Sequence, residues 1–294
     1  KSASIEAVKI DVILKDAVLP KLKMSAVTSS AVAAWRDRRL KQVSGATVNR
    51  EIDVLSAVFN HARREWDVHV ENPIPLIKRP DKARARDRRF SAEEERYLLA
   101  ALTGGERLAD GTFSKGARNH WLLPLVKLAI ETAMRRGELL SLSWEHVDLV
   151  RQTAHLPDTK NGDPRTVPLS TRAVAILKAL PTPEADEDFE GEKEVQRSGA
   201  VFPTTALALR KGFARAIERA QEQYRADCKQ AKRRPVPGFL EDVHFHDTRH
   251  EAASRLAEKL TNVLELSAVT GHKDLRMLKR YYHPRAEDLA KKLG

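Results

Sequence analysis

The 294-residue chain has one cysteine, Cys228, which excludes an internal disulfide framework and a cysteine-based zinc site. No apolar run reaches the roughly 18 residues that a membrane span needs, and the N-terminus has no apolar core of a signal peptide. The 13 glycines and 14 prolines are too few for a collagen-like or linker-like chain. These absences favour a globular protein of the cytoplasm without a membrane partner.

The chain has a surplus of positive charge and enough apolar residues for a packed core. It has 52 Lys and Arg against 41 Asp and Glu, a net charge of +11, and 41% hydrophobic residues. A surplus of this size favours an anionic partner, with nucleic acid first, although a basic but inert surface is the alternative. Charge alone does not separate a protein that holds DNA from one that reacts with it.

The first 70 residues read as helices. We expect one helix over roughly Ile5–Val18 and another over Ala31–Lys41, capped by Ser29 or Ser30. A stronger pattern starts at Ser44 and predicts one apolar helix face about 20 residues long. The apolar positions of that face are Val48, Ile52, Leu55, Phe59, Ala62 and Trp66. Its other face carries Asn49, Arg50, Asn60, Arg63 and Arg64.

A proline-rich and basic stretch, Asn72–Arg89, interrupts the helical pattern. It holds seven basic and two acidic residues, and its prolines exclude a continuous helix. Two alternatives fit this composition equally well: a linker that contacts a phosphate backbone, and a linker that is merely solvated. Ser91 and Glu94 have the spacing of a capping box and mark the start of a second domain. We therefore expect a helical domain over 1–83, a linker over 84–90 and a second domain over 91–294.

The second domain reads as helical with one small sheet. Trp121–Met134 is an apolar helix, and Thr153–Leu156 and Arg165–Leu169 flank an Asn-Gly pair that predicts a β-hairpin. Glu184–Glu194 is strongly acidic and Arg225–Arg234 strongly basic, and both look like exposed inserts or loops. The fold class we predict is mostly α with a small antiparallel β-sheet (α+β).

Several polar residues of this domain suit one reaction on a phosphodiester. Arginines match the non-bridging oxygens bidentately, lysine protonates a leaving alkoxide, histidines move protons near neutral pH, and tyrosine can attack to form a covalent ester. Each residue alone has a plainer reading as a cap, an ion pair or core packing. The candidates are Arg135, Arg136, Lys160, His246, Arg249, His250, His272, Tyr281 and Tyr282.

Metal binding by His246 and His250 is the weaker alternative. The two histidines are four residues apart, a spacing that can chelate a metal. No glutamate lies between them in the manner of an HExxH motif, and Arg249 would place a cation beside the metal. We therefore expect no metal and no other cofactor.

Five stretches resemble the tyrosine recombinases, the phage-integrase type of site-specific DNA recombinase. They occur in the family's order over nearly the whole chain. They are SGATVNREIDVLSAVFNHARREW, ETAMRRGELLSLSWEHVDL, TKNGDPRTVPLS, HFHDTRHEAASRLAE and VTGHKDLRMLKRYYH. The resemblance implies a helical core-binding domain followed by a catalytic domain. The family's first domain has four or more helices, so we expect a further helix ahead of Lys1.

The resemblance also implies a role for individual residues. The family's first arginine falls on Arg135, with Glu138 as the acid that supports the site. The hairpin lysine falls on Lys160, which would be the general acid. The remaining positions, which would stabilise the phosphorane or assist proton transfer, are His246, Arg249 and His272. His250 matches a frequent histidine after the HxxR box and would support the site, and Thr248 departs from the family's usual leucine.

The nucleophile is one of two neighbouring tyrosines. The family's Tyr-x-His pattern selects Tyr281, followed by Tyr282 and His283. A helix over residues 274–282 agrees, because Leu275 and Leu278 would define a core face with Tyr282 in its middle and Tyr281 to one side. We therefore predict Tyr281 as the nucleophile.

The resemblance implies an enzyme that cuts and rejoins double-stranded DNA at specific core sites through a 3′-phosphotyrosine, for integration, excision or inversion of a mobile element. Members act as homotetramers on two DNA sites, in some cases with accessory DNA-bending proteins. We expect the tail 286–294 either to pack onto a neighbouring subunit or to be a frayed end. We expect a prokaryotic cytoplasmic protein associated with the nucleoid. The rival functions are a type IB-like relaxing topoisomerase and a non-catalytic DNA-binding regulator.

Overall fold

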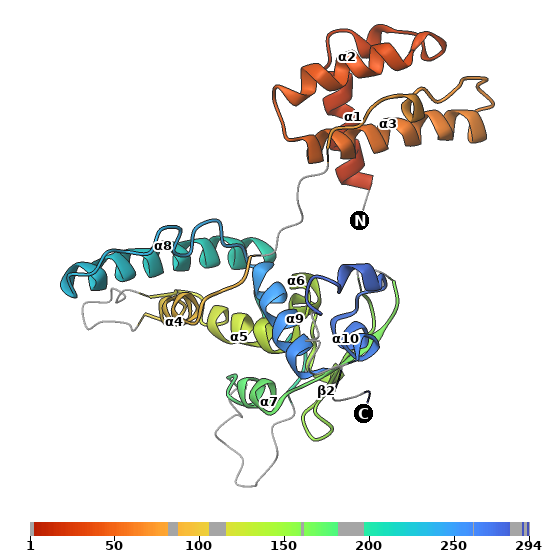
Figure 1. Cartoon of the computed structure of the whole chain (residues 1–294). Coiled ribbons are helices and arrows are strands. Elements are labelled where there is room, and N and C mark those ends of the chain that lie inside the picture. Colours follow the sequence, from red (N-terminus) through yellow and green to blue (C-terminus); the bar gives the residue numbers. More distant parts are fainter. Residues whose placement is uncertain are drawn as a thin grey trace, which may run out of the picture. The chain divides into compact units, whose positions relative to one another are not determined.

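A computed structural model describes residues 3–81, 88–105, 116–159, 162–181, 197–260, 262–282, 290 and 293. The chain divides into two compact units, residues 1–86 and 87–294. Figure 1 shows mainly helices in both units and one small sheet in the larger unit. The predicted fold class, mostly α with a small antiparallel sheet, is confirmed.

Three helices pack around an apolar core in the smaller unit. They are α1 (Ala3–Leu14), α2 (Ser29–Leu40) and α3 (Gly45–Glu65), with 3-10 turns η1 (Leu19–Lys21), η2 (Met24–Ala26) and η3 (Ile74–Leu76). Ser44 caps α3 by accepting a hydrogen bond from the Thr47 N–H. The predicted apolar positions of α3 are buried as far as Ala62, and they pack against Trp35 of α2.

Three details of this unit differ from the sequence prediction. The cap of α2 is Thr28, whose hydroxyl accepts from the Ala31 N–H, and not Ser29 or Ser30. Trp66 lies beyond the end of α3 and is 61% exposed, because the backbone has already left the helical conformation there. The first helix ends at Leu14, and Asp16 then accepts the backbone N–H groups of the next turn.

A central apolar helix organises the larger unit. This helix, α5 (Leu122–Thr132), packs against α7 (Thr171–Lys178) and α9 (Asp247–Lys259), while α4 (Ala92–Ala101) lies along α8 (Ala206–Gln230) (Figure 1). The short elements are α6 (Arg136–Leu140), α10 (Val263–Thr270) and the 3-10 turns η4 (Trp144–His146) and η5 (Leu275–Met277). Within the described ranges, no helix is long and apolar enough to cross a membrane.

The predicted hairpin is present in a three-stranded antiparallel sheet. The strands are β1 (Val147–Asp148), β2 (Thr153–Leu156) and β3 (Arg165–Pro168), in the order β1-β2-β3. Leu156 is paired with Arg165, and Gly162 has φ +84° in the connecting turn. This φ is in the left-handed region that favours glycine. Lys160 and Asn161 lie outside the described residues.

Two buried carboxylates hold the start of the larger unit. Ser91 and Glu94 form the predicted capping box of α4, and Glu94 also pairs with Arg88. Glu251 of α9 is 3% exposed and pairs with Arg89 at 3.2 Å. The sequence places both arginines in a linker that either contacts a phosphate backbone or is merely solvated, and the structure pairs them with carboxylates of their own unit.

Two segments of the larger unit correct the sequence prediction. The expected helix 274–282 is only the 3-10 turn η5, because the N–H groups of Met277, Leu278 and Tyr281 each donate to the carbonyl three residues earlier. Leu278 is buried, but Leu275 is 40% exposed, so no apolar helix face forms. The basic segment 225–234 is not a loop throughout, since its first six residues complete α8. The acidic segment 184–194 lies outside the described residues.

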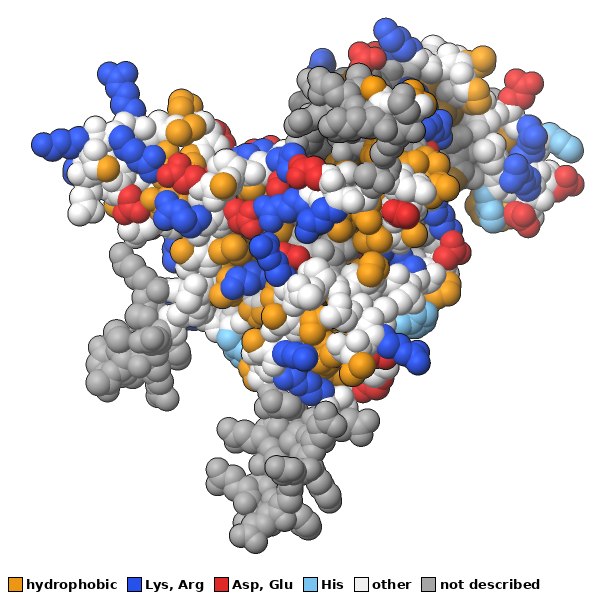
Figure 2. Space-filling view, turned by 60° about the horizontal axis from the view of Figure 1, so that its bottom comes forward, with side chains coloured by type: hydrophobic (Ala, Val, Ile, Leu, Met, Phe, Trp, Pro, Cys, Tyr) orange, Lys and Arg blue, Asp and Glu red, His pale blue; other side chains and the backbone are white. Residues whose placement is uncertain are grey.

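Positive charge is spread over the face of the molecule that Figure 2 shows. Figure 2 shows lysine and arginine side chains in several groups, with acidic and apolar side chains beside them. The net charge of +11 is therefore not concentrated in one patch on this face.

Candidate active site

The loop between α5 and α6 presents Arg135. Ala133 ends α5 in the left-handed conformation, with φ 52°, and turns the chain so that Arg135 becomes the cap residue of α6. The Arg135 guanidinium donates to Glu138 Oε1 at 2.8 Å and to the Gly271 carbonyl at 2.8 Å. Its side chain keeps 20% of its surface exposed, so it can reach an incoming anion.

Glu138 is a buried carboxylate shared by two arginines. It is 3% exposed and also accepts from Arg165 Nη2 of β3 at 2.7 Å. Burial works to raise the pKa of Glu138, but the charge of Arg165 and hydrogen bonds from Arg135 and Arg165 outweigh burial and hold it below its usual range. Glu138 is therefore ionised at neutral pH and fixes both guanidinium groups.

Arg249 lies deeper than Arg135. Its residue is 4% exposed, and its guanidinium donates to the Ala133 carbonyl and, at 2.6 Å, to the Thr270 carbonyl. Burial, together with the neighbouring charge of Arg135, lowers the pKa of Arg249 to about 10. The side chain remains cationic at pH 7.

The three arginines converge on the C-terminal end of α10. Arg165 donates to the carbonyl of Val269, Arg249 to that of Thr270 and Arg135 to that of Gly271. The last carbonyls of a helix have no intrahelical partner and carry the negative end of its dipole. Three successive carbonyls therefore receive three guanidinium groups from three other elements, and we call this arrangement the arginine clasp.

His272 directly follows the arginine clasp. Its Nδ1 lies 2.7 Å from the Thr270 hydroxyl, which donates its own proton to the Leu266 carbonyl at 2.6 Å. We assign the ring proton to Nδ1 on this network, so Nε2 accepts from Arg249 at 3.3 Å. Burial and the charges of Arg249 and Arg135 lower the pKa of His272 to about 3, and the ring is neutral at pH 7.

Tyr281 reaches the same site from the chain that follows η5. Its hydroxyl forms a short hydrogen bond with His250 Nδ1, and its ring centroid lies 6.3 Å from that of His272. Burial raises the pKa of Tyr281, while the charges of Arg280 and Arg249 oppose this. Tyr282 is also partly buried, but the bond to the histidine is made by Tyr281.

The histidines of α9 differ in exposure. His246 caps the helix and is exposed, whereas His250 is 8% exposed, and the two rings meet edge to face at 5.1 Å. Thr248, at the family's usual leucine position, is buried and donates its hydroxyl to the Phe245 carbonyl. This bond accounts for a polar side chain beside the site without a role in the chemistry.

The sequence predicts six site residues and one supporting acid, Glu138. The structure brings five of these seven residues together, and it adds one residue that the sequence did not single out. The five are Arg135, Glu138, Arg249, His272 and Tyr281. His246 borders them through its contact with His250, and Lys160 lies outside the described residues. The residue missed is Arg165, whose only sequence signal is its position on the hairpin strand after the predicted lysine. Among the described residues, no three His, Cys, Asp or Glu side chains are grouped to hold a metal ion.

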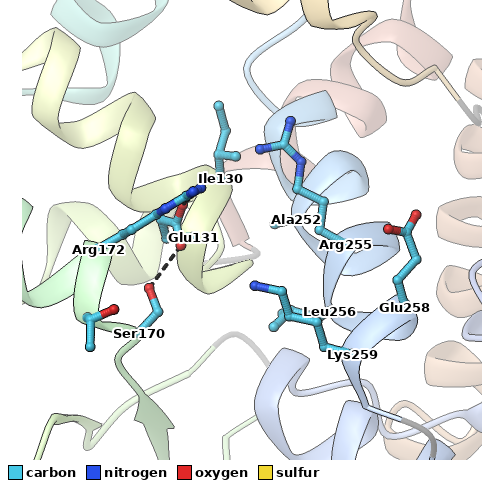
Figure 3. A pocket seen from close by; sticks show the side chains of 10 residues that line it. Ile130, Glu131, Ser170, Arg172, Ala252, Arg255, Leu256, Glu258 and Lys259 are labelled. Atoms are coloured by element: carbon cyan, nitrogen blue, oxygen red, sulfur yellow. Dashed lines mark hydrogen bonds and ion pairs between the residues drawn. The ribbon is translucent and has the colours of Figure 1, made fainter.

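A separate hollow of about 410 Å³ lies between α5, the start of α7 and α9 (Figure 3). Ser170 donates to Glu131 at its floor, and Arg172, Arg255 and Lys259 line it. Its lining residues do not include those of the arginine clasp or Tyr281. The geometry and charge of the clasp, rather than this hollow, suit a phosphodiester.

Known proteins resemble this chain along its whole length. A model of the phage integrase family matches residues 89–288, and one of the phage integrase N-terminal domain matches residues 8–79. A shufflon-specific DNA recombinase of Escherichia coli is 38% identical over 279 residues, covering 92% of this chain. The chain spans about three fifths of that protein, 61% of its length.

Solved integrase structures share the fold. The Tn1549 transposon integrase (residues 82–397 of that protein) in complex with circular intermediate DNA has a TM-score of 0.68 at 17% identity, covering 100% of this chain and 93% of that one. A lambda integrase tetramer bound to a Holliday junction has a TM-score of 0.64 at 20% identity, covering 93% and 71%.

Proposed function

Because this chain belongs to the phage integrase family, the tyrosine recombinases, we propose that it is a site-specific DNA recombinase with Tyr281 as its nucleophile. The observation that carries the proposal is the meeting of Tyr281, Arg249 and Arg135 at one site from parts of the chain far apart in sequence. His272 joins them, because its ring contacts the Arg249 guanidinium and lies 6.3 Å from the Tyr281 ring, while Arg135 donates to the carbonyl of the preceding residue, Gly271.

The chemistry follows from the charges of the site. Tyr281 Oη attacks the scissile phosphorus, an Oη–P bond forms, and the P–O5′ bond breaks. Arg135 and Arg249 stabilise the negative charge on the non-bridging oxygens, as guanidinium groups do in phosphoryl transfer. Lys160 protonates the leaving 5′-oxygen, and His246 assists proton transfer. His272, whose Nε2 accepts from Arg249, supports that arginine in stabilising the phosphorane. A 5′-hydroxyl then reverses these steps, so the energy of the phosphodiester is conserved in the tyrosyl ester.

The rest of the chain serves DNA binding in this proposal. Residues 1–83 form the core-binding domain, residues 91–294 the catalytic domain, and the segment between them links the two on duplex DNA. The exposed arginines of α3, Arg50, Arg63 and Arg64, support phosphate contacts, whose strength falls with salt concentration. The lambda integrase tetramer on a Holliday junction supports a homotetramer on two DNA sites. Accessory DNA-bending proteins and association with the nucleoid belong to the same proposal.

The test is trapping of a covalent adduct. The purified chain is incubated with sheared DNA of its host, and DNA that stays attached to protein after denaturation is isolated and sequenced. We expect one recurrent site, and we expect Tyr281→Phe to abolish the adduct while Tyr282→Phe retains it. An adduct that survives Tyr281→Phe overturns the assignment of the nucleophile.

The rival topoisomerase shares this chemistry and needs a second readout. A substrate that carries two copies of the trapped site separates the two functions. Recombinant product supports the recombinase, whereas relaxation of a supercoiled plasmid without recombinants supports the topoisomerase. A protein that binds the site without forming an adduct is a regulator.

A further inference from the structure

We propose that His250 Nδ1 accepts the phenolic proton of Tyr281 as Tyr281 Oη attacks the phosphate, which makes His250 a further catalytic residue. The inference rests on the proposed function. It assigns a proton acceptor for the nucleophile, a task that the family resemblance does not give to this position. The carrying observation is the hydrogen bond between the two atoms that would exchange the proton.

The fold holds both partners of this hydrogen bond. His250 follows Arg249 in the first turns of α9 and is 8% exposed, with its ring against the edge of His246. The Tyr281 N–H donates to the carbonyl of the fully buried Leu278 at 2.9 Å, which fixes the backbone of the tyrosine. The ring centroids of His250 and Tyr281 lie 5.9 Å apart. The contact is therefore built by the core and not by a free surface side chain.

The protonation states suit a transfer from oxygen to nitrogen. A phenol hydroxyl is the donor, and a neutral imidazole with its proton on Nε2 offers the Nδ1 lone pair as acceptor. Burial, followed by the charge of His246, lowers the pKa of His250 to about 4, so the ring is neutral before DNA binds. The titratable and charged groups around it are His246, Asp247, Arg249, His272, Arg280 and Tyr281.

DNA binding makes His250 a stronger base, as removal of the Tyr281 proton requires. A phosphodiester brings a negative charge next to the ring, and a nearby opposite charge favours the protonated imidazole and raises its pKa. A general base works best when its pKa lies near the working pH. The ring is thus a weak base in the free protein and a stronger one in the DNA complex.

The proton balance of the step closes with Lys160 as the acid. In cleavage, the Oη–H bond breaks and His250 gains its proton, while Lys160 gives a proton to the leaving 5′-oxygen. In ligation, the incoming 5′-hydroxyl returns a proton to Lys160 and His250 protonates Tyr281 Oη. Both groups are restored after one cleavage and one ligation, and no further reactant is needed.

The experiment distinguishes a residue that deprotonates the nucleophile from one that protonates the leaving group. Duplex DNA of the trapped sequence is prepared with its normal scissile phosphate, and again with a bridging 5′-sulfur, whose thiolate leaves without protonation. We expect His250→Gln to form adduct roughly 10²–10⁴-fold more slowly than the parent chain on both substrates, the range of general base catalysis. Lys160→Ala is expected to be slow on the oxygen substrate and fast on the sulfur substrate.

Three controls keep the outcome interpretable. His155→Gln changes an exposed histidine of β2 in the same unit and is expected to retain the parent rate. The non-covalent affinity of His250→Gln for the duplex and its unfolding midpoint show whether the variant is folded. Added imidazole is expected to speed His250→Gly, and the low-pH inflection of the parent rate is expected to vanish in His250→Gln.

Each outcome is decisive. If the parent chain forms no adduct, the proposed function fails. If the parent reacts and folded His250→Gln reacts within about threefold of it, the assignment of His250 is wrong. Restoration of His250→Gln by the sulfur substrate also overturns the assignment, because it would place His250 on the leaving-group side. If His250→Gln does not fold, failure of imidazole to speed His250→Gly overturns it.

Discussion

Replacing Glu138 with glutamine removes the counter-charge of two arginines while keeping the shape of the side chain. Glu138 is 3% exposed, and its partners Arg135 and Arg165 keep 20% and 11% of their side-chain surface. Loss of one member of a buried ion pair costs about 3–5 kcal/mol, because a desolvated charge is left without its partner. Since Arg135 is partly solvated, we expect the lower end, about 3 kcal/mol.

The assay is thermal and urea unfolding of the whole chain, with Glu131→Gln as the matched control. Glu131 pairs with Arg172 at 3.9 Å, and the Arg172 side chain is 82% exposed. A solvated pair of this kind contributes roughly 0–1 kcal/mol. For Glu138→Gln we expect the unfolding midpoint of the larger unit to fall by roughly 6–12 °C, from the entropy of unfolding of a unit of about 200 residues.

A double variant tests the cause of this loss. If the cost arises from unpaired guanidinium groups, Arg165→Met removes one of them. Glu138→Gln combined with Arg165→Met should then cost at least about 1 kcal/mol less than the sum of the two single changes. Additive costs, or a Glu138→Gln effect no larger than that of Glu131→Gln, would refute the reasoning.

Three further predictions concern the same unit. In the folded chain the pKa of His250 is about 4 and that of His272 about 3, whereas the ordinary histidine pKa is 6.5. As the pH first falls below 6.5, the two histidines are therefore protonated in the unfolded chain but not in the folded one. Stability is therefore retained above pH 6.5 and lost below it, by roughly 2 kcal/mol for each histidine at pH 5. Urea unfolding at pH 5 and pH 8 measures the loss, and an unchanged pH dependence in His250→Gln would contradict its origin. Gly271 has φ +67°, and an alanine there would place its Cβ 2.8 Å from Arg165 Nε. We expect Gly271→Ala to lower the free energy of unfolding by roughly 1–3 kcal/mol in thermal unfolding, and an unchanged value would contradict this. Ser91→Ala removes the cap of α4 and should lower the free energy of unfolding in urea by about 1 kcal/mol, while Ser91→Gly should cost only a few tenths.

The sequence predicts the elements whose signals are local. The apolar repeat of α3, the capping box at Ser91 and the Asn-Gly hairpin are all present, because each depends on residues within one or two turns. Trp66 fits the same repeat but lies beyond the last helical turn, and a repeat does not show where a helix stops. The helix expected over 274–282 fails for a similar reason, since two leucines at a spacing of three fit a 3-10 turn as well.

The candidate site is less readable from sequence than the elements that carry it. The family resemblance selects Arg135, Arg249, His272 and Tyr281, and the structure brings them together, while their roles stay predictions. Arg165 was not selected, because its bonds go to a carboxylate and a carbonyl of two other elements. Every residue has a backbone carbonyl, so a sequence does not show which carbonyl accepts a hydrogen bond from a distant side chain. Contacts of this kind are known only from the three-dimensional structure.

The arginine clasp affects which residues can be used to judge whether a related protein is still active on DNA. Its three guanidinium groups bond to the last carbonyls of α10, so we expect selection for a folded protein to preserve them even where selection for a reaction on DNA has ceased. A descendant that had become a silent DNA-binding protein would keep these arginines. The hydroxyl of Tyr281 bonds to His250 instead, so under the proposed function its retention is the better mark of a lineage that cuts DNA.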